Sequence, residues 1–159
     1  MLIRTLSAHS MVVIDWRCEQ NEGIYLDVDL LEIILNNAIS NATTHGRRKG
    51  VVHVDLDLQN DELVLTVRNE PGIQHVALCE NLRLNNGRWW ILKSSGGRDS
   101  YNVGLETIRQ CAAIGKYTIT LTANTTSVVF TLTGTITRTS NDHLSAQWSV
   151  DNVFVDHSL

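Results

Sequence analysis

The segment DVDLLEIILNNAISNATTHG spans residues 27–46 and carries the clearest structural signal in the chain. Its apolar residues recur at helical spacing, with Leu30, Ile34 and Ala38 each four residues apart. An aspartate at its start favours a helix N-terminus, and glycine is the residue usually found just past a helix end. We therefore predict an amphipathic helix that begins near Asp27 and ends near Gly46.

Three asparagines, Asn36, Asn37 and Asn41, interrupt this apolar segment. Asparagine is a poor helix former because its side chain competes for backbone hydrogen bonds. Asn37 and Asn41 lie four residues apart, so both amides leave the helix on the same face. Either this edge of the helix is simply solvated, or its two amide oxygens point toward a cation or a polar ligand.

Composition limits the kind of protein. The chain has 159 residues, 43% of them hydrophobic, which suits one globular domain with a real core. A net charge of −4 argues against nucleic acid as a partner, and no apolar run reaches the length of a membrane span. Three widely spaced cysteines argue against a disulfide framework or a zinc site and favour a reducing compartment. We expect a cytoplasmic protein.

Alternating apolar residues predict β-strands on both sides of the helix. The turn Gln59–Glu62 joins two of them into a hairpin, and residues 124–127 join two more. Residues 75–99 form a long connection without clear periodicity, which is typical of a functional or disordered loop. The strands are predicted at residues 11–16, 51–58, 63–68, 117–123 and 128–132.

The order of these elements strengthens a resemblance that residues 35–42, LNNAISNA, carry by themselves. This segment resembles the N-box of the GHKL (Bergerat-fold) ATPases, and most closely that of sensor histidine kinases. In that family the asparagine matching Asn41 supplies its oxygen to Mg²⁺ on the nucleotide phosphates, and the one matching Asn37 sits beside the metal. The resemblance implies an α+β, two-layer α/β sandwich with a mixed, mostly antiparallel sheet that helices cover on one face. We expect this domain at residues 1–134 and a C-terminal extension at 135–159.

The base-binding part of the resemblance is altered. Pro71, Gly72 and Ile73 match the end of the family's first glycine box, but its adenine-binding Asp falls on Arg68. Arginine has only hydrogen-bond donors and cannot accept a bond from the adenine amino group. Asn69 has an amide oxygen that could, so it is the candidate adenine reader; a degenerate pocket is the alternative.

The phosphate-binding part is also partial. Thr44 stands where the family often has a phosphate-binding lysine, which leaves His45 or Lys49 for that role. Residues 75–99 match the family's ATP lid, and the segment Asn102–Leu105 resembles its second glycine box, a turn that brings backbone N–H groups to phosphates at a helix start. The resemblance therefore implies a nucleotide site made of Asn37, Asn41, His45, Lys49, Asn69, Gly72, Ile73, Arg98, Asn102, Val103, Gly104 and Leu105.

The function implied is that of an ATP- and Mg²⁺-binding kinase domain. Asn37 and Asn41 would be its catalytic residues, Asn41 its metal ligand, and the acceptor a histidine on a separate dimerisation hairpin domain. Residues 153–158 faintly resemble the start of a receiver domain, as in a hybrid kinase.

Two alternatives stay open. An anti-sigma-factor-type serine kinase or switch protein has a similar N-box followed by a histidine, as at His45, but carries Glu where this chain has Asn37. An amide cannot act as a base, which favours the histidine-kinase interpretation. A pseudokinase binding module would explain Arg68 and Asn102, which depart from the family's glycine boxes.

Overall fold

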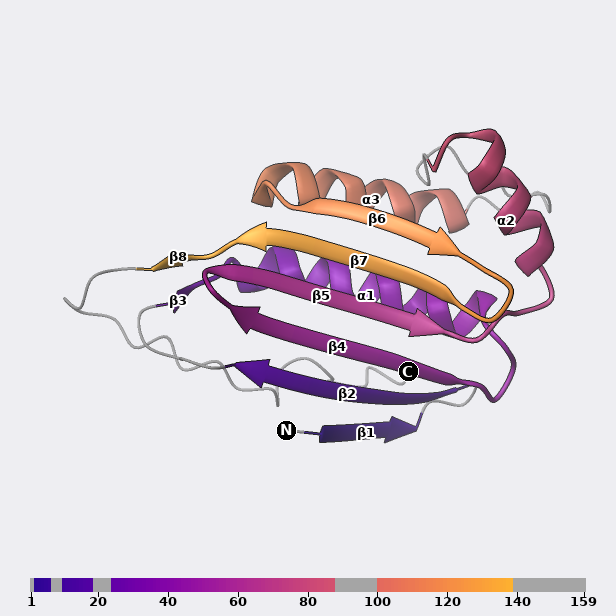
Figure 1. Cartoon of the computed structure of the whole chain (residues 1–159), viewed down its shortest axis with the longest axis horizontal. Coiled ribbons are helices and arrows are strands. Elements are labelled where there is room, and N and C mark those ends of the chain that lie inside the picture. The colour runs from indigo at the N-terminus through magenta and orange to yellow at the C-terminus, as the bar shows by residue number, and fades with distance from the viewer. Residues whose placement is uncertain (1, 7–9, 19–23, 88–99, 139–159) are drawn as a thin grey trace.

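A β-sheet and the helices that pack on it form two layers (Figure 1). The computed structural model describes residues 2–6, 10–18, 24–87 and 100–138. Within these ranges the elements are β1 (Leu2–Leu6), β2 (Met11–Cys18), β3 (Ile24–Tyr25), α1 (Val28–His45), β4 (Val51–Gln59), β5 (Glu62–Asn69), α2 (His75–Leu84), α3 (Ser100–Gly115), β6 (Thr118–Ala123), β7 (Val128–Thr135) and β8 (Thr137–Arg138).

Six strands form one mixed sheet in the order β1-β2-β4-β5-β7-β6. Among the described strands, only β2 and β4 pair in parallel, because the connection between them contains α1 and crosses over the sheet. The other neighbours pair antiparallel. The predicted fold class, a mostly antiparallel sheet covered on one face by helices, is confirmed.

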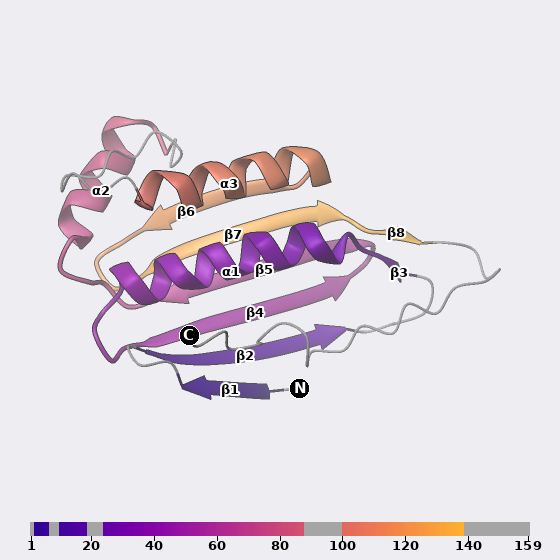
Figure 2. The ribbon, with the colours of Figure 1, turned by 180° about the vertical axis from the view of Figure 1, so that it is seen from behind.

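Helices α1 and α3 lie side by side on the same face of the sheet (Figure 2). Strict alternation along β4 and β5 turns Val54, Leu65 and Val67 toward these helices, where each is nearly inaccessible to solvent. Ile34 on α1 and Ile108 on α3 complete the centre of this core. The register of β5 therefore decides which of its side chains can reach the helix layer.

Helix α1 begins and ends where the sequence predicts. Asp27 caps it, with its Oδ1 accepting a hydrogen bond from the backbone N–H of Leu30 at 3.1 Å. Gly46 follows its last residue in an extended conformation, with φ −75° and ψ −175°, so no left-handed residue ends this helix. Glycine is required there for space, because a Cβ atom would overlap the carbonyl oxygen of Ala42.

The structure contains two elements that the sequence did not predict. The connection after β5 is not irregular at its start, because residues 75–84 form helix α2. The segment before residue 11, which carries no sequence signal, contains the edge strand β1. In the part of the chain that the structure describes, no helix is long and apolar enough to cross a membrane.

Packing also continues past residue 134. Strand β7 runs to Thr135, Ile136 is buried, and β8 pairs antiparallel with β3. The first four residues of the expected C-terminal extension, 135–138, are therefore part of this fold, and its remainder, 139–159, lies outside the described residues.

Candidate functional site

Asn37 and Asn41 point from α1 toward one place on α3. A Cβ atom on Gly104 would lie 3.2 Å from Asn37 Oδ1 and 3.6 Å and 3.7 Å from Asn41 Nδ2 and Oδ1. The two carboxamides therefore converge on Gly104, whose lack of a side chain lets the two helices come this close. Both asparagines are partly buried, whereas Asn36 is exposed.

The two amides differ in how they are satisfied. Asn37 donates from Nδ2 to the carbonyl oxygen of Ile33 at 2.8 Å, one turn back along α1. This bond fixes the amide, so Oδ1 is the atom that Asn37 presents toward Gly104. Asn41 Nδ2 is buried and has no hydrogen-bond partner among the described residues. A buried amide donor without a partner costs free energy, so it indicates a missing acceptor.

These atoms suit a magnesium–phosphate group. Mg²⁺ prefers oxygen ligands and retains several of its waters, so one or two amide oxygens are enough. Phosphate oxygens would supply the acceptor that Asn41 Nδ2 lacks. Two amide oxygens and an unpaired buried donor therefore favour the interpretation as a metal–phosphate site over the interpretation as a solvated helix edge.

Asn69 lies at the end of β5 and on the helix side of the sheet. It is 8% exposed and continues the buried alternation of Leu65 and Val67, whereas Arg68 is exposed on the opposite face. Asn69 donates from Nδ2 to the carbonyl oxygen of Glu70 at 3.0 Å. Because side chains alternate between the two faces of β5, the amide of Asn69 lies beside the end of α1 and the guanidinium of Arg68 does not.

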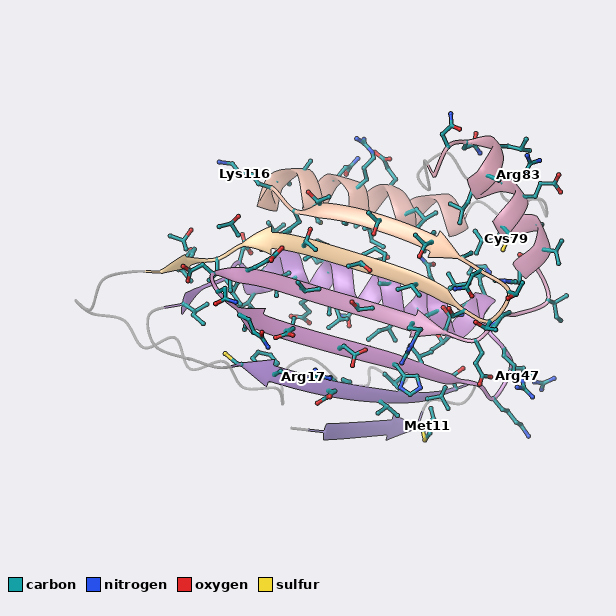
Figure 3. The ribbon with its side chains drawn as sticks, viewed as in Figure 1. Met11, Arg17, Arg47, Cys79, Arg83 and Lys116 are labelled. Atoms are coloured by element: carbon teal, nitrogen blue, oxygen red, sulfur yellow. The ribbon has the colours of Figure 1, made fainter. Side chains whose placement is uncertain are left out.

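Several short contacts hold the end of α1 against the end of β5. Residues 45–47 and 69–72 make these contacts, and we call them the junction between α1 and β5. The backbone N–H of Arg47 donates to the carbonyl oxygen of Glu70 at 3.1 Å, and Arg47 Nη1 pairs with Glu70 Oε2 at 3.2 Å. Figure 3 shows Arg47 in the loop between α1 and β4. Gly46 and Pro71 form an isolated β-bridge. Gly72 packs so closely that a Cβ atom would overlap the carbonyl oxygen of His45.

The predicted basic groups are placed differently from one another. His45 is the last residue of α1 and is partly buried, and this burial lowers its pKa below the ordinary value. Lys49 is exposed in a left-handed conformation with φ 60°. Arg47, which lies between these two residues in the chain, pairs with Glu70. Ile73 is fully exposed, with 104% relative accessibility, next to the start of α2.

The second glycine box has a different local structure from the one predicted. Residues 102–104 are not a turn before a helix, because α3 already begins at Ser100. Gly104 is its fifth residue, so its N–H lies beyond the unpaired N–H groups at the helix start. Leu105 is 6% exposed and belongs to the core. The side chains of Asn102 and Val103, and all of Arg98, lie outside the described residues.

Sequence reasoning missed the contact between Arg47 and Glu70. The two residues lie 23 positions apart, and their opposite charges signal an ion pair only once the strand register is known. It also missed why Gly46 and Gly72 are glycines, since both are required by close packing against main-chain carbonyls.

Comparison with known proteins identifies the fold. No protein-family model and no curated protein matches the chain. Among solved structures, the chain is similar to the nucleotide-free catalytic domain of histidine kinase ThkA, with a TM-score of 0.57 and 14% identity over 78% of this chain and 78% of that one. It is also similar to Acinetobacter baumannii histidine kinase AdeS, with a TM-score of 0.54, 14% identity, and 79% of this chain covered.

The chain spans 54% of the AdeS chain, about half its length. Full-length ShkA in complex with AMPPNP is a third match, with a TM-score of 0.54 and 13% identity over 82% of this chain and 27% of that one. Identities this low establish the fold alone. The chain has the fold of histidine-kinase catalytic domains, which is the fold that the sequence resemblance predicted.

Proposed function

We propose that this domain binds ATP with Mg²⁺ between α1, the turn after β5 and the N-terminal half of α3, and donates the γ-phosphoryl group to a histidine on another domain. The observation that carries the proposal is the pair of carboxamides from Asn37 and Asn41 that converge on Gly104. The fold shared with histidine-kinase catalytic domains supports it.

Each site residue has a part that its geometry allows. Asn41 offers Oδ1 to the metal and its unpaired Nδ2 to a phosphate oxygen. Asn37 presents an oxygen held in place by the bond to Ile33. Asn69, at the far end of the junction, offers an amide oxygen to the base. Bound Mg²⁺ would neutralise phosphate charge, which is the main requirement of phosphoryl transfer besides positioning.

No carboxylate or imidazole need act as a base in this scheme. An acceptor imidazole is itself the nucleophile. The domain therefore needs only to hold the triphosphate with its γ-phosphorus in line with the attacking nitrogen. Asn37 is an amide and cannot remove a proton from a serine hydroxyl. The proposal therefore favours a histidine acceptor over a serine acceptor.

A second candidate is a binding module that holds nucleotide without transferring phosphate. The position of Gly104 inside α3 favours the binding module. The family's second glycine box is a turn whose N–H groups reach the phosphates, and in this chain residues 102–104 are helical instead. Transfer to a histidine-containing acceptor domain, followed with radiolabelled ATP, separates the two candidates. Labelling supports the kinase, and tight binding without labelling supports the module.

Calorimetry of ADP and ATP binding tests the nucleotide site itself. We expect binding that requires Mg²⁺ and that Asn41→Ala weakens by tenfold or more, since a ligand and a buried hydrogen bond are lost together, about 1.5–3 kcal/mol. Asn36→Ala, on the exposed face of the same helix, is the matched control and should bind as the wild type does. Equal affinity of Asn41→Ala and Asn36→Ala would remove the metal assignment.

A further inference from the structure

The carboxamide of Asn69 is held in one orientation. Its Nδ2 donates to the carbonyl oxygen of Glu70 at 3.0 Å, and the residue is 8% exposed. The same Nδ2 packs against Gly46, where an added Cβ atom would lie 2.7 Å away. A buried donor that loses its acceptor costs free energy, so rotating the amide by half a turn is unfavourable. The orientation leaves Oδ1 as the atom available to a ligand.

The Glu70 carbonyl oxygen, which accepts the bond from Asn69, is itself held in place. The carbonyl oxygen of Glu70 also accepts the backbone N–H of Arg47 at 3.1 Å, so both of its lone pairs are used. The side chains of the same two residues pair at 3.2 Å. The carbonyl therefore cannot turn away from position 69 without breaking the junction between α1 and β5.

An aspartate at position 69 would meet this carbonyl oxygen with a carboxylate oxygen. Neither atom carries a hydrogen, so the Nδ2 bond would be replaced by repulsion between two acceptors in a buried place. A carboxylate is the group that the family resemblance would restore near this position. The junction in this chain instead demands an amide.

We propose that the Glu70 carbonyl, held by Arg47, is a positioning group that makes Asn69 a fixed hydrogen-bond acceptor and makes aspartate unsuitable there. The proposal rests on the proposed function, since it names the base that the same site selects. A fixed acceptor accepts a bond from the 6-amino group of adenine and opposes the 6-oxo group of hypoxanthine. The domain therefore prefers ADP to inosine diphosphate.

The first experiment compares Asn69→Asp with Asn69→Ala in calorimetric titrations with Mg²⁺ and ADP at neutral pH. Asn69→Ala should weaken ADP binding about tenfold, because one hydrogen bond to the base is lost. Asn69→Asp should bind no more tightly than Asn69→Ala. Tighter binding by Asn69→Asp than by Asn69→Ala would overturn the proposal.

Asn60→Asp is the matched control. Asn60 lies in the exposed turn before β5, at the opposite end of that strand from Asn69, so the variant makes the same charge change away from the junction. It should bind ADP as the wild type does.

The second experiment needs no nucleotide and keeps the orientation testable if binding fails. In urea unfolding at neutral pH, Asn69→Asp should be less stable than Asn69→Ala, and the gap should narrow at mildly acidic pH. A protonated carboxyl group can donate to the Glu70 carbonyl, as the amide does. The difference isolates residue 69, because the titratable and charged residues adjoining Gly46 and Asn69 in the chain are the same in both variants: His45, Arg47, Arg68 and Glu70. Equal stability at neutral pH would overturn the fixed orientation.

The third experiment compares nucleotide affinities of the wild-type domain and does not depend on the folding of Asn69→Asp. The wild type's affinity for ADP should exceed that for inosine diphosphate by at least about tenfold, because a repelled acceptor replaces a hydrogen bond. Equal affinities would overturn the proposal. Binding of neither nucleotide would refute the proposed function, whereas the stability comparison would still decide the orientation.

Discussion

Replacing Asn41 with alanine should stabilise the domain in the absence of nucleotide, although the same change should weaken metal-dependent nucleotide binding by tenfold or more. The reason is the buried Asn41 Nδ2, which has no hydrogen-bond partner in the described part of the chain. A residue kept for binding a ligand leaves such an atom unsatisfied until the ligand arrives. A residue whose role is structural has its buried polar atoms paired within the protein.

The expected size follows from three contributions. Removing an unsatisfied buried donor is worth about 1–3 kcal/mol. Alanine in place of asparagine inside a helix adds about 0.6 kcal/mol. Lost packing of the short side chain subtracts about 0.8 kcal/mol, the value of one buried methylene. The net gain in the free energy of unfolding is about 1–3 kcal/mol, or roughly 2–12 °C in melting temperature for a chain of this size.

Thermal and urea unfolding, with and without ADP and Mg²⁺, measure both effects. Asn36→Ala is the control for helix propensity, because Asn36 is exposed on the same helix and should gain only about 0.6 kcal/mol. At the same nucleotide concentration, the rise in melting temperature should be equal for the wild type and Asn36→Ala and clearly smaller for Asn41→Ala. A loss of more than 1 kcal/mol in Asn41→Ala without ligand would mark Asn41 as structural and refute the reasoning.

Three further predictions concern the scaffold. Gly72→Ala should destabilise the domain by about 1–3 kcal/mol in urea unfolding, because the new methyl group overlaps main-chain oxygens at the end of α1; an unchanged midpoint would contradict this packing. Asp27→Ala should cost about 1 kcal/mol through loss of the helix cap, measured in the same way, and no cost would show that the cap contributes nothing. The hydrogen bond from Arg109, with a smaller contribution from the Gln110 side chain, lowers the pKa of Glu106 to about 2. In an NMR titration, Arg109→Ala should therefore raise the midpoint of the Glu106 carboxyl toward its ordinary value, and an unmoved midpoint would exclude Arg109 as the cause.

The elements found from sequence are those whose apolar pattern faces the core. Helix α1 places Leu31, Ile34 and Ala38 in the core at helical spacing, and β4 alternates without interruption. Helix α2 gives no comparable signal, since Leu82 is its only buried residue. A helix that is exposed on most of its surface leaves little pattern in the sequence.

The candidate site was predictable where it depends on one helix. The spacing of Asn37 and Asn41 fixes their shared face whatever the rest of the chain does. Contacts between elements were not predictable, because they depend on register and packing. That Asn69 rather than Arg68 faces the helices follows from the parity of β5, and the place of Gly104 inside α3 follows from where that helix begins.

The central claim is that a metal-bound nucleotide sits against the carboxamides of Asn37 and Asn41. Mn²⁺ in place of Mg²⁺ tests it most directly, because the paramagnetic ion broadens the NMR signals of nearby nuclei. In the presence of ADP and Mn²⁺, the side-chain amide signals of Asn37 and Asn41 should disappear while that of Asn60, in the distant hairpin turn, persists. Sharp signals from Asn37 and Asn41 under saturating nucleotide would contradict the claim.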